Sequence, residues 1–161
     1  MVSILNPLRR FARLPSSERA LLLRAGLVVA FIRLVLWTRP WPSVVRFVQV
    51  LPPLPSLGAG PFSADRLAWA VRQSSRLVPA ATCLTQSLAL QCALTAAGLP
   101  SSVEIGVAKE PTGEFQSHAW VEHDGHTLLS PPADVMRYTR LLTLPAPTPT
   151  QGWPLRADPG R

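Results

Sequence analysis

The sequence predicts an α+β fold in which helices pack on a small antiparallel sheet. Apolar residues follow a helical period up to Gly98 and an alternating period after it. Asp124-Gly125, a strong two-residue hairpin signal, joins two of the alternating stretches. The 161 residues are 47% hydrophobic and 16% charged, which suits a folded domain with its own core and excludes a disordered protein.

An N-terminal helical region is predicted over residues 1–50. Its most apolar part, residues 20–37, approaches the length of a membrane span but is interrupted by Arg24 and Arg33. A span needs about 20 mostly apolar residues, and a central arginine costs about 2.5–3.5 kcal/mol. We therefore expect a mostly buried helix of a soluble protein, with peripheral membrane contact through this region as the alternative.

The sequence also predicts where this first helix begins and ends. Ser16 or Ser17 is the expected N-cap, and Glu18 is favourable in the first turn. The helix is expected to stop before Pro40, because proline cannot continue it. A second short helix is predicted over 43–48.

Proline-rich stretches divide the chain. Residues 51–61, LPPLPSLGAGP, predict a linker, and the tail 145–161 is predicted to be disordered. Residues 62–144 then form the second folded part.

Two helices open this second part. Residues 63–76 predict a helix capped by Ser63, and residues 82–97 predict another that ends at Gly98. An apolar stripe is expected on the second helix, made of Leu84, Leu88 and Cys92 and widened by Leu90 and Leu94.

Strands follow the two helices. Alternation predicts strands over 103–107, 118–122 and 126–129, the last two joined by the Asp124-Gly125 turn. A short helix is expected over 134–142.

The charge balance is strongly basic. The chain has 16 Lys and Arg against 9 Asp and Glu, for a net charge of +7. Such a balance favours acidic peptides or anionic lipids, although a general preference for arginine over lysine explains it equally well. We expect no nucleic-acid partner, because no basic run is interleaved with aromatics and no zinc-finger or RNA-binding signature is present.

Cys83 and His118 are the candidate catalytic pair. Cys83 begins the predicted helix 82–97, where unpaired N–H groups and the helix dipole favour a thiolate and can stabilise an oxyanion. His118, on a predicted strand 35 residues later, is the candidate base. These residues alone leave open a cysteine that is merely packed in the core.

The local sequence around the pair is more specific. The helix that Cys83 opens ends in Gly98-Leu99-Pro100, and residues 118–122 read His-Ala-Trp-Val-Glu, followed by Asp124-Gly125. Over residues 63–140 the chain resembles the bacterial transglutaminase-like cysteine protease family of lasso peptide biosynthesis, the leader peptidases of those pathways. The resemblance implies a transglutaminase-like or papain-like cysteine protease core.

By this resemblance Cys83 is the nucleophile and His118 the general base, with a third, acidic residue orienting the histidine. The expected strand 126–129 contains no acid. Asp134 is therefore the first candidate for the third residue, and Ser130 or a backbone carbonyl is the alternative.

The resemblance implies a cytoplasmic cysteine peptidase that removes the leader from a ribosomally made lasso precursor peptide. It implies two partner proteins, a small leader-recognition protein and a macrolactam-forming cyclase, and no cofactor. Two alternatives stay open: an acyl-transferring enzyme of transglutaminase type on the same fold, and a non-enzymatic basic helical adaptor. Cys92, His123 and His126 are not expected to form a disulfide or a metal site with Cys83 or His118.

Overall fold

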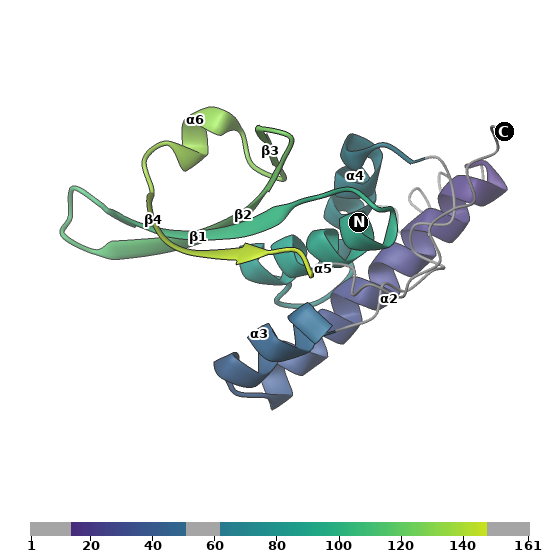
Figure 1. Cartoon of the computed structure of the whole chain (residues 1–161), viewed down its shortest axis with the longest axis horizontal. Coiled ribbons are helices and arrows are strands. Elements are labelled where there is room, and N and C mark those ends of the chain that lie inside the picture. Colours follow the sequence, from purple (N-terminus) through teal and green to yellow (C-terminus); the bar gives the residue numbers. More distant parts are fainter. Residues whose placement is uncertain (1–13, 51–61, 148–161) are drawn as a thin grey trace, which may run out of the picture.

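The computed structural model describes residues 14–50 and 62–147, so the predicted linker 51–61 and most of the predicted disordered tail lie outside the described residues. The α+β prediction is confirmed: helices pack beside one four-stranded antiparallel sheet (Figure 1). The elements, in chain order, are α2 (Ser16–Thr38), α3 (Trp41–Val50), α4 (Ala64–Ser75), α5 (Cys83–Ala96), β1 (Ser102–Lys109), β2 (Phe115–His123), β3 (His126–Leu128), α6 (Pro132–Val135) and β4 (Thr139–Pro145).

The sheet has the strand order β3-β2-β1-β4. The predicted β2–β3 hairpin is confirmed, and both turn residues have the positive φ that a type I′ turn requires, 47° at Asp124 and 77° at Gly125. The helix predicted over 134–142 is wrong. Only α6 is helical there, and β4 follows it, because the backbone of β4 pairs with the otherwise unpaired edge of β1.

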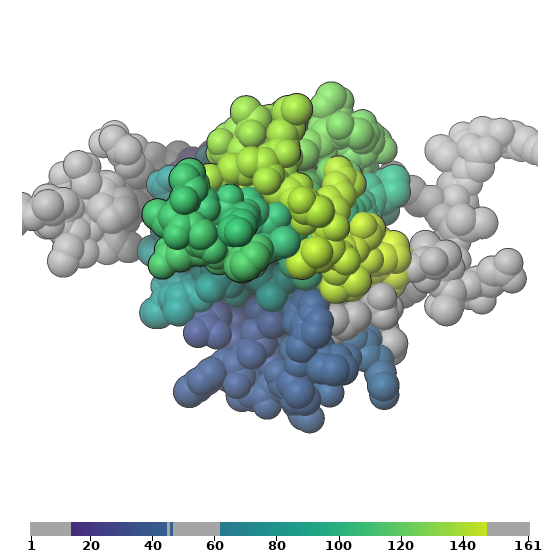
Figure 2. Space-filling view, turned by 90° about the vertical axis from the view of Figure 1, so that its left-hand side faces the viewer, coloured from purple at the N-terminus to yellow at the C-terminus, as the bar shows by residue number. Residues whose placement is uncertain are grey.

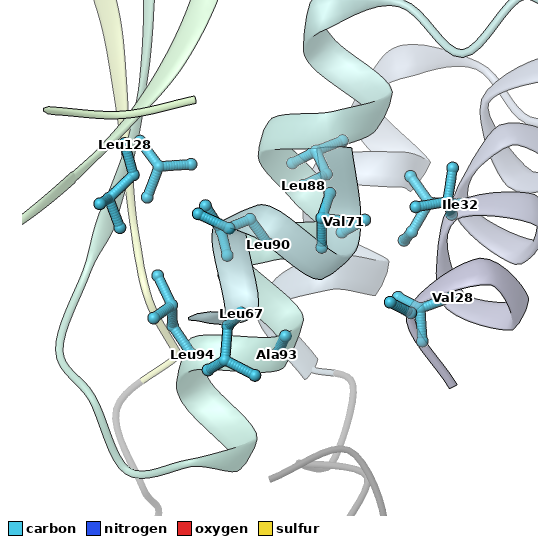
Figure 3. Packing of buried hydrophobic residues seen from close by; sticks show 14 of the residues in the cluster. Val28, Ile32, Leu67, Val71, Leu88, Leu90, Ala93, Leu94 and Leu128 are labelled. Carbon is cyan, nitrogen blue, oxygen red and sulfur yellow. The ribbon is translucent and has the colours of Figure 1, made fainter. Parts of the chain in front are cut away.

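Helix α5 forms the middle layer of the molecule. In Figure 3, Leu90 and Leu94 lie toward Leu128 of the sheet, whereas Leu88 lies on the side of α4 and α2. No residue of α5 is exposed, because α2, α4 and β2 all pack against it. The single apolar stripe expected for this helix is therefore wrong: the helix is enclosed on all sides, and Leu84 and Cys92 are only half-buried.

Helix α2 packs on this middle layer through one side only. The buried residues at helical spacing are Leu21, Ala25, Val28, Val29 and Ile32. The expectation of a mostly buried helix is wrong, because the opposite side carries exposed leucine and tryptophan side chains.

The ends of α2 agree with the sequence in part. The helix ends at Thr38, before Pro40, as predicted. Its N-cap position is Pro15, with no side-chain cap bond, so the predicted serine cap is wrong. Glu18 instead accepts a hydrogen bond from Arg66 of α4, which joins the two helices at this end.

Two buried helical serines offer a test of the helix packing. Ser74 donates its hydroxyl to the Leu22 carbonyl of α2 at 2.9 Å, whereas the buried Ser87 hydroxyl of α5 has no partner among the residues that the structure describes. Replacing serine with alanine raises the intrinsic helix propensity by a similar amount at both positions. We expect Ser74→Ala to lower the free energy of unfolding by about 1 kcal/mol and Ser87→Ala to raise it by up to about 1 kcal/mol. Urea denaturation of both variants checks this, and equal effects would contradict it.

Candidate active site

Cys83 is the first residue of α5, as the sequence predicts. Thr82 caps the helix, and its hydroxyl accepts from the Thr85 N–H at 3.5 Å. Gln86, one turn into the helix, donates to the Ala81 carbonyl at 3.3 Å and so ties down the segment before the cysteine. Cys83 is a free, half-buried thiol beside the N–H groups of the first helical turn.

His118 lies on β2, opposite Gly106 of β1. Its Nε2 is 2.8 Å from the Ser130 hydroxyl, which follows β3. The imidazole is flanked by two aromatic rings, with centroid distances of 6.2 Å to Trp120 and 5.2 Å to Tyr138. The ring of His118 is thus held by a hydrogen bond on one side and aromatic contacts on others.

Gly106 makes room for this aromatic cluster. A Cβ at this position would lie 3.0 Å from the Trp120 ring and 3.0 Å from atoms of Tyr138 and Thr139. The missing side chain lets the Trp120 ring lie across β1, where the tryptophan is 1% exposed. The sequence did not identify Tyr138 as a site residue, because the segment around it was predicted to be a helix.

A tight turn presents Ser130 to His118. Leu129 has a φ of 70°, which a non-glycine residue seldom adopts, and Thr127 donates its hydroxyl to the Ser130 carbonyl at 3.2 Å. Ser130 also lines an open pocket of about 520 Å³ between α4 and the segment after β3, with Trp69 and Arg72 on the α4 side. Ser130 therefore borders a space that is open to solvent, whereas His118 and Cys83 are not among the residues that line this pocket.

Asp134, the first candidate for the orienting residue, is exposed on α6. No hydrogen bond joins Asp134 and His118, both of which the structure describes; the hydrogen-bonding group is Ser130. Asp134 acts on the imidazole through its charge. Burial lowers the pKa of His118, the positive charge of Arg137 lowers it further, and the carboxylate of Asp134 opposes both.

These opposing charges predict opposite effects on the titration of His118. Arg137→Gln is expected to raise the pKa of His118 and Asp134→Asn to lower it further. An NMR titration of the imidazole signals checks this, with His123 and His126 as internal references. Shifts of the same sign in both variants would contradict it.

The same pKa has a consequence for stability. Folding lowers the pKa of His118 below its ordinary value of 6.5, so the folded state favours the neutral imidazole. The contribution of this preference to the free energy of unfolding is fully present above pH 6.5 and is lost as the pH falls through the pKa of His118 in the folded state. A neutral imidazole is the form that can accept a proton.

The two halves of the candidate pair belong to packed elements. Helix α5 packs against β2, but no hydrogen bond joins Cys83 to His118, both within the described residues. The Nδ1 atom of His118 likewise has no hydrogen-bond partner in the described part of the chain. Because Ser130 occupies Nε2, Nδ1 is the nitrogen that is left to take a proton.

The remaining candidates have other partners. Burial raises the pKa of the Cys92 thiol to about 12, which leaves it protonated. Glu122 accepts from the Trp120 indole at 3.1 Å and from Arg140, and His123 contacts the Pro100 carbonyl at 2.6 Å. In residues 14–50 and 62–147, no group of three His, Cys, Asp or Glu side chains is placed to hold a metal ion.

Helices packed beside a small four-stranded antiparallel sheet, with Cys83 at the start of one helix, agree with a transglutaminase-like domain. The transglutaminase-like superfamily matches residues 26–143, and the chain belongs to this superfamily. The superfamily includes cysteine peptidases and acyltransferases, and its fold is generally enzymatic. The match begins inside α2, so the second half of that helix is included in it. No curated protein and no solved structure matches the chain significantly.

Proposed function

We propose that the chain is a cytoplasmic cysteine peptidase that removes the leader from a ribosomally made lasso precursor peptide. The observation that carries the proposal is the pairing of helix and strand in a transglutaminase-like domain. Cys83 begins a helix that packs on β2, and the His118 ring on β2 is held by Ser130 with Nδ1 unoccupied. The resemblance of the Cys83 helix and of residues 118–122 to the leader peptidases supports the choice of substrate.

The proposed reaction follows from these positions. The thiol proton of Cys83 passes to Nδ1 of His118, and the sulfur attacks the carbonyl carbon of the leader–core bond. The carbonyl oxygen becomes an oxyanion that the free N–H groups of the first turn of α5 stabilise. The C–N bond then breaks, and the leaving amine takes the proton from the imidazolium. Water, activated by the same imidazole, releases the leader as a carboxylate and restores the thiol.

Ser130 and Asp134 have different roles in this proposal. With Nε2–H donating to the Ser130 hydroxyl, Nδ1 carries the lone pair that accepts the thiol proton. Ser130 is therefore the positioning residue for the ring. Asp134 favours the transient imidazolium through its negative charge, which agrees with its raising effect on the pKa of His118.

The proposal includes two protein partners, a small leader-recognition protein and the macrolactam-forming cyclase that uses the freed core peptide. The family resemblance supports both. In this proposal the extended precursor approaches through the open pocket that Ser130 lines.

A cleavage assay tests this proposal. The full chain is mixed with a precursor peptide and a leader-recognition protein, and the products are identified by mass spectrometry. We expect two fragments whose masses add up to the mass of the precursor plus one water. Neither fragment should form with His118→Asn. His126→Asn, at an exposed histidine of β3, is the matched control and is expected to cleave like the wild type.

Two other outcomes would overturn the proposal. An adduct in which an amine replaces water would assign the chain to acyl transfer. An intact precursor with wild type and variants alike would favour the non-enzymatic adaptor.

A further inference from the structure

Helix α2 carries a second apolar stripe that nothing in the described fold covers. Leu23, Leu27, Leu34 and Trp37 are all exposed, with Leu27 72% and Trp37 77% accessible. At 100° per residue these four side chains lie within about 80° of one another around the helix. They point away from the buried stripe through which α2 packs on α4 and α5.

Arginines border this outer stripe on both sides. On the same helical projection, Arg24 lies beyond one edge of the stripe and Arg33 beyond the other. Both are half-buried, and an arginine at such a border can cover apolar surface with its stem while its charged end stays in water. The two arginines are nine residues apart and so lie on opposite sides of the helix, where they border its outer face.

The charge around the stripe is one-sided. Residues 16–50 carry five arginines and a single acid, Glu18. Glu18 is paired with Arg66 of α4, so it does not neutralise the arginines beside the stripe. An apolar stripe bordered by arginine, with tryptophan at one end of the helix, is typical of helices that lie in the headgroup region of a membrane.

We propose that the outer stripe of α2 binds the surface of an anionic phospholipid membrane. Helix α2 lies along one edge of the described part of the chain in Figure 1, and its four stripe side chains are exposed there, so the stripe can lie flat on a bilayer. No acid among the described residues pairs with Arg24 or Arg33, and the lipid headgroups would supply that negative charge, while the leucines and Trp37 enter the boundary between headgroups and acyl chains.

Spanning the membrane is a different arrangement that the packing excludes. Helix α2 is long and apolar enough to cross a bilayer by length and composition. Crossing would remove its buried stripe from α4 and α5, which share one hydrophobic core with it. The family match also begins within this helix, which includes its second half in the folded domain.

A second copy of this chain is a poorer occupant of the stripe. Arg24 and Arg33 lie at similar distances on either side of the centre of the stripe. Two copies packed through it would gather four arginines around one interface, and the only acid of residues 16–50, Glu18, is already paired with Arg66, so the like charges would repel.

Vesicle sedimentation with the full chain tests the proposal. We expect wild-type protein to sediment with vesicles of phosphatidylcholine and phosphatidylglycerol, less with phosphatidylcholine alone, and less at high salt. The variant Leu27→Glu with Trp37→Glu is expected to bind the mixed vesicles about tenfold more weakly or less.

A control variant places the same charges elsewhere. Phe115→Glu with Leu141→Glu changes side chains that are 73% and 67% exposed on β2 and β4. In Figure 1 the sheet and α6 lie on the left and α2 runs along the right, and Figure 2, viewed from the sheet end, shows the sheet and α6 above α3. This control is expected to bind vesicles nearly like the wild type, apart from the small loss caused by two added negative charges.

Three results would overturn the proposal. They are a wild-type chain that stays in solution with anionic vesicles, a stripe variant that binds no worse than the control variant, and a dimer in light scattering that the stripe variant abolishes. Circular dichroism melts of all variants show that the changes leave the fold intact. The assay needs no precursor peptide, so its outcome is independent of the proposed peptidase activity.

Discussion

Cys83→Ala is expected to abolish cleavage of the precursor, lowering kcat/KM by about 10⁴-fold or more while the protein stays folded. The proposed nucleophile is the sulfur of Cys83, and alanine offers no group that can form the acyl-enzyme. The fold should tolerate the change, because Cys83 is half-buried at the first position of α5 and its thiol makes no hydrogen bond within the described residues. The measurement is the single-cut mass assay, with circular dichroism to confirm folding.

Cys92→Ala is the matched control, because it removes a free thiol from the same helix. Burial raises the pKa of Cys92 to about 12, so this thiol stays protonated at neutral pH and is a poor nucleophile. We expect Cys92→Ala to cleave the precursor and iodoacetamide to label Cys83 in preference to Cys92. Cleavage by Cys83→Ala at the wild-type rate would remove Cys83 as nucleophile and favour the adaptor.

Trp120→Ala is expected to lower the free energy of unfolding by about 3–5 kcal/mol, the usual range for a buried tryptophan. The side chain is 1% exposed and lies over Gly106, beside the rings of His118 and Tyr138. Its indole also donates to Glu122 at 3.1 Å. Alanine leaves a cavity against the glycine and removes the support of the His118 ring. Urea denaturation measures the loss.

Trp37→Ala is the matched control for this effect. Trp37 is 77% exposed, and its removal should change the stability by less than about 0.5 kcal/mol. If Trp120→Ala fails to fold, Trp120→Phe keeps the test open, since it retains most of the apolar contact and should unfold at an intermediate urea concentration. Equal stabilities of Trp37→Ala and Trp120→Ala would show that the aromatic cluster does not stabilise the sheet.

Local signals predicted most of the elements. Ser63 caps α4 as expected, with its hydroxyl 3.3 Å from the Arg66 N–H, and Asp124-Gly125 forms the β2–β3 turn. Strand β4 was missed because its pairing with β1 joins segments far apart in the sequence. All but one of its residues are exposed, so β4 carries no alternating apolar pattern to reveal it.

The candidate site was predictable to a similar degree. The sequence placed Cys83 at a helix start and His118 on a strand, because both positions follow from local patterns. It favoured Asp134 over Ser130 as the partner of His118, since an acid is expected from the family resemblance. The hydrogen bond to Ser130 depends on the left-handed backbone conformation of Leu129. Leucine seldom adopts this conformation, so the sequence does not predict it.

The enclosure of α5 restricts how this chain can diversify. No residue of the helix that begins at Cys83 is exposed, so most substitutions within its buried part would disturb packing. New substrate preferences can be acquired more easily in the segments that border the pocket, such as residues 129–132, than in α5. In the proposed peptidase, the enclosed helix would support the sulfur of Cys83, and the residues at the pocket could change with less effect on the fold.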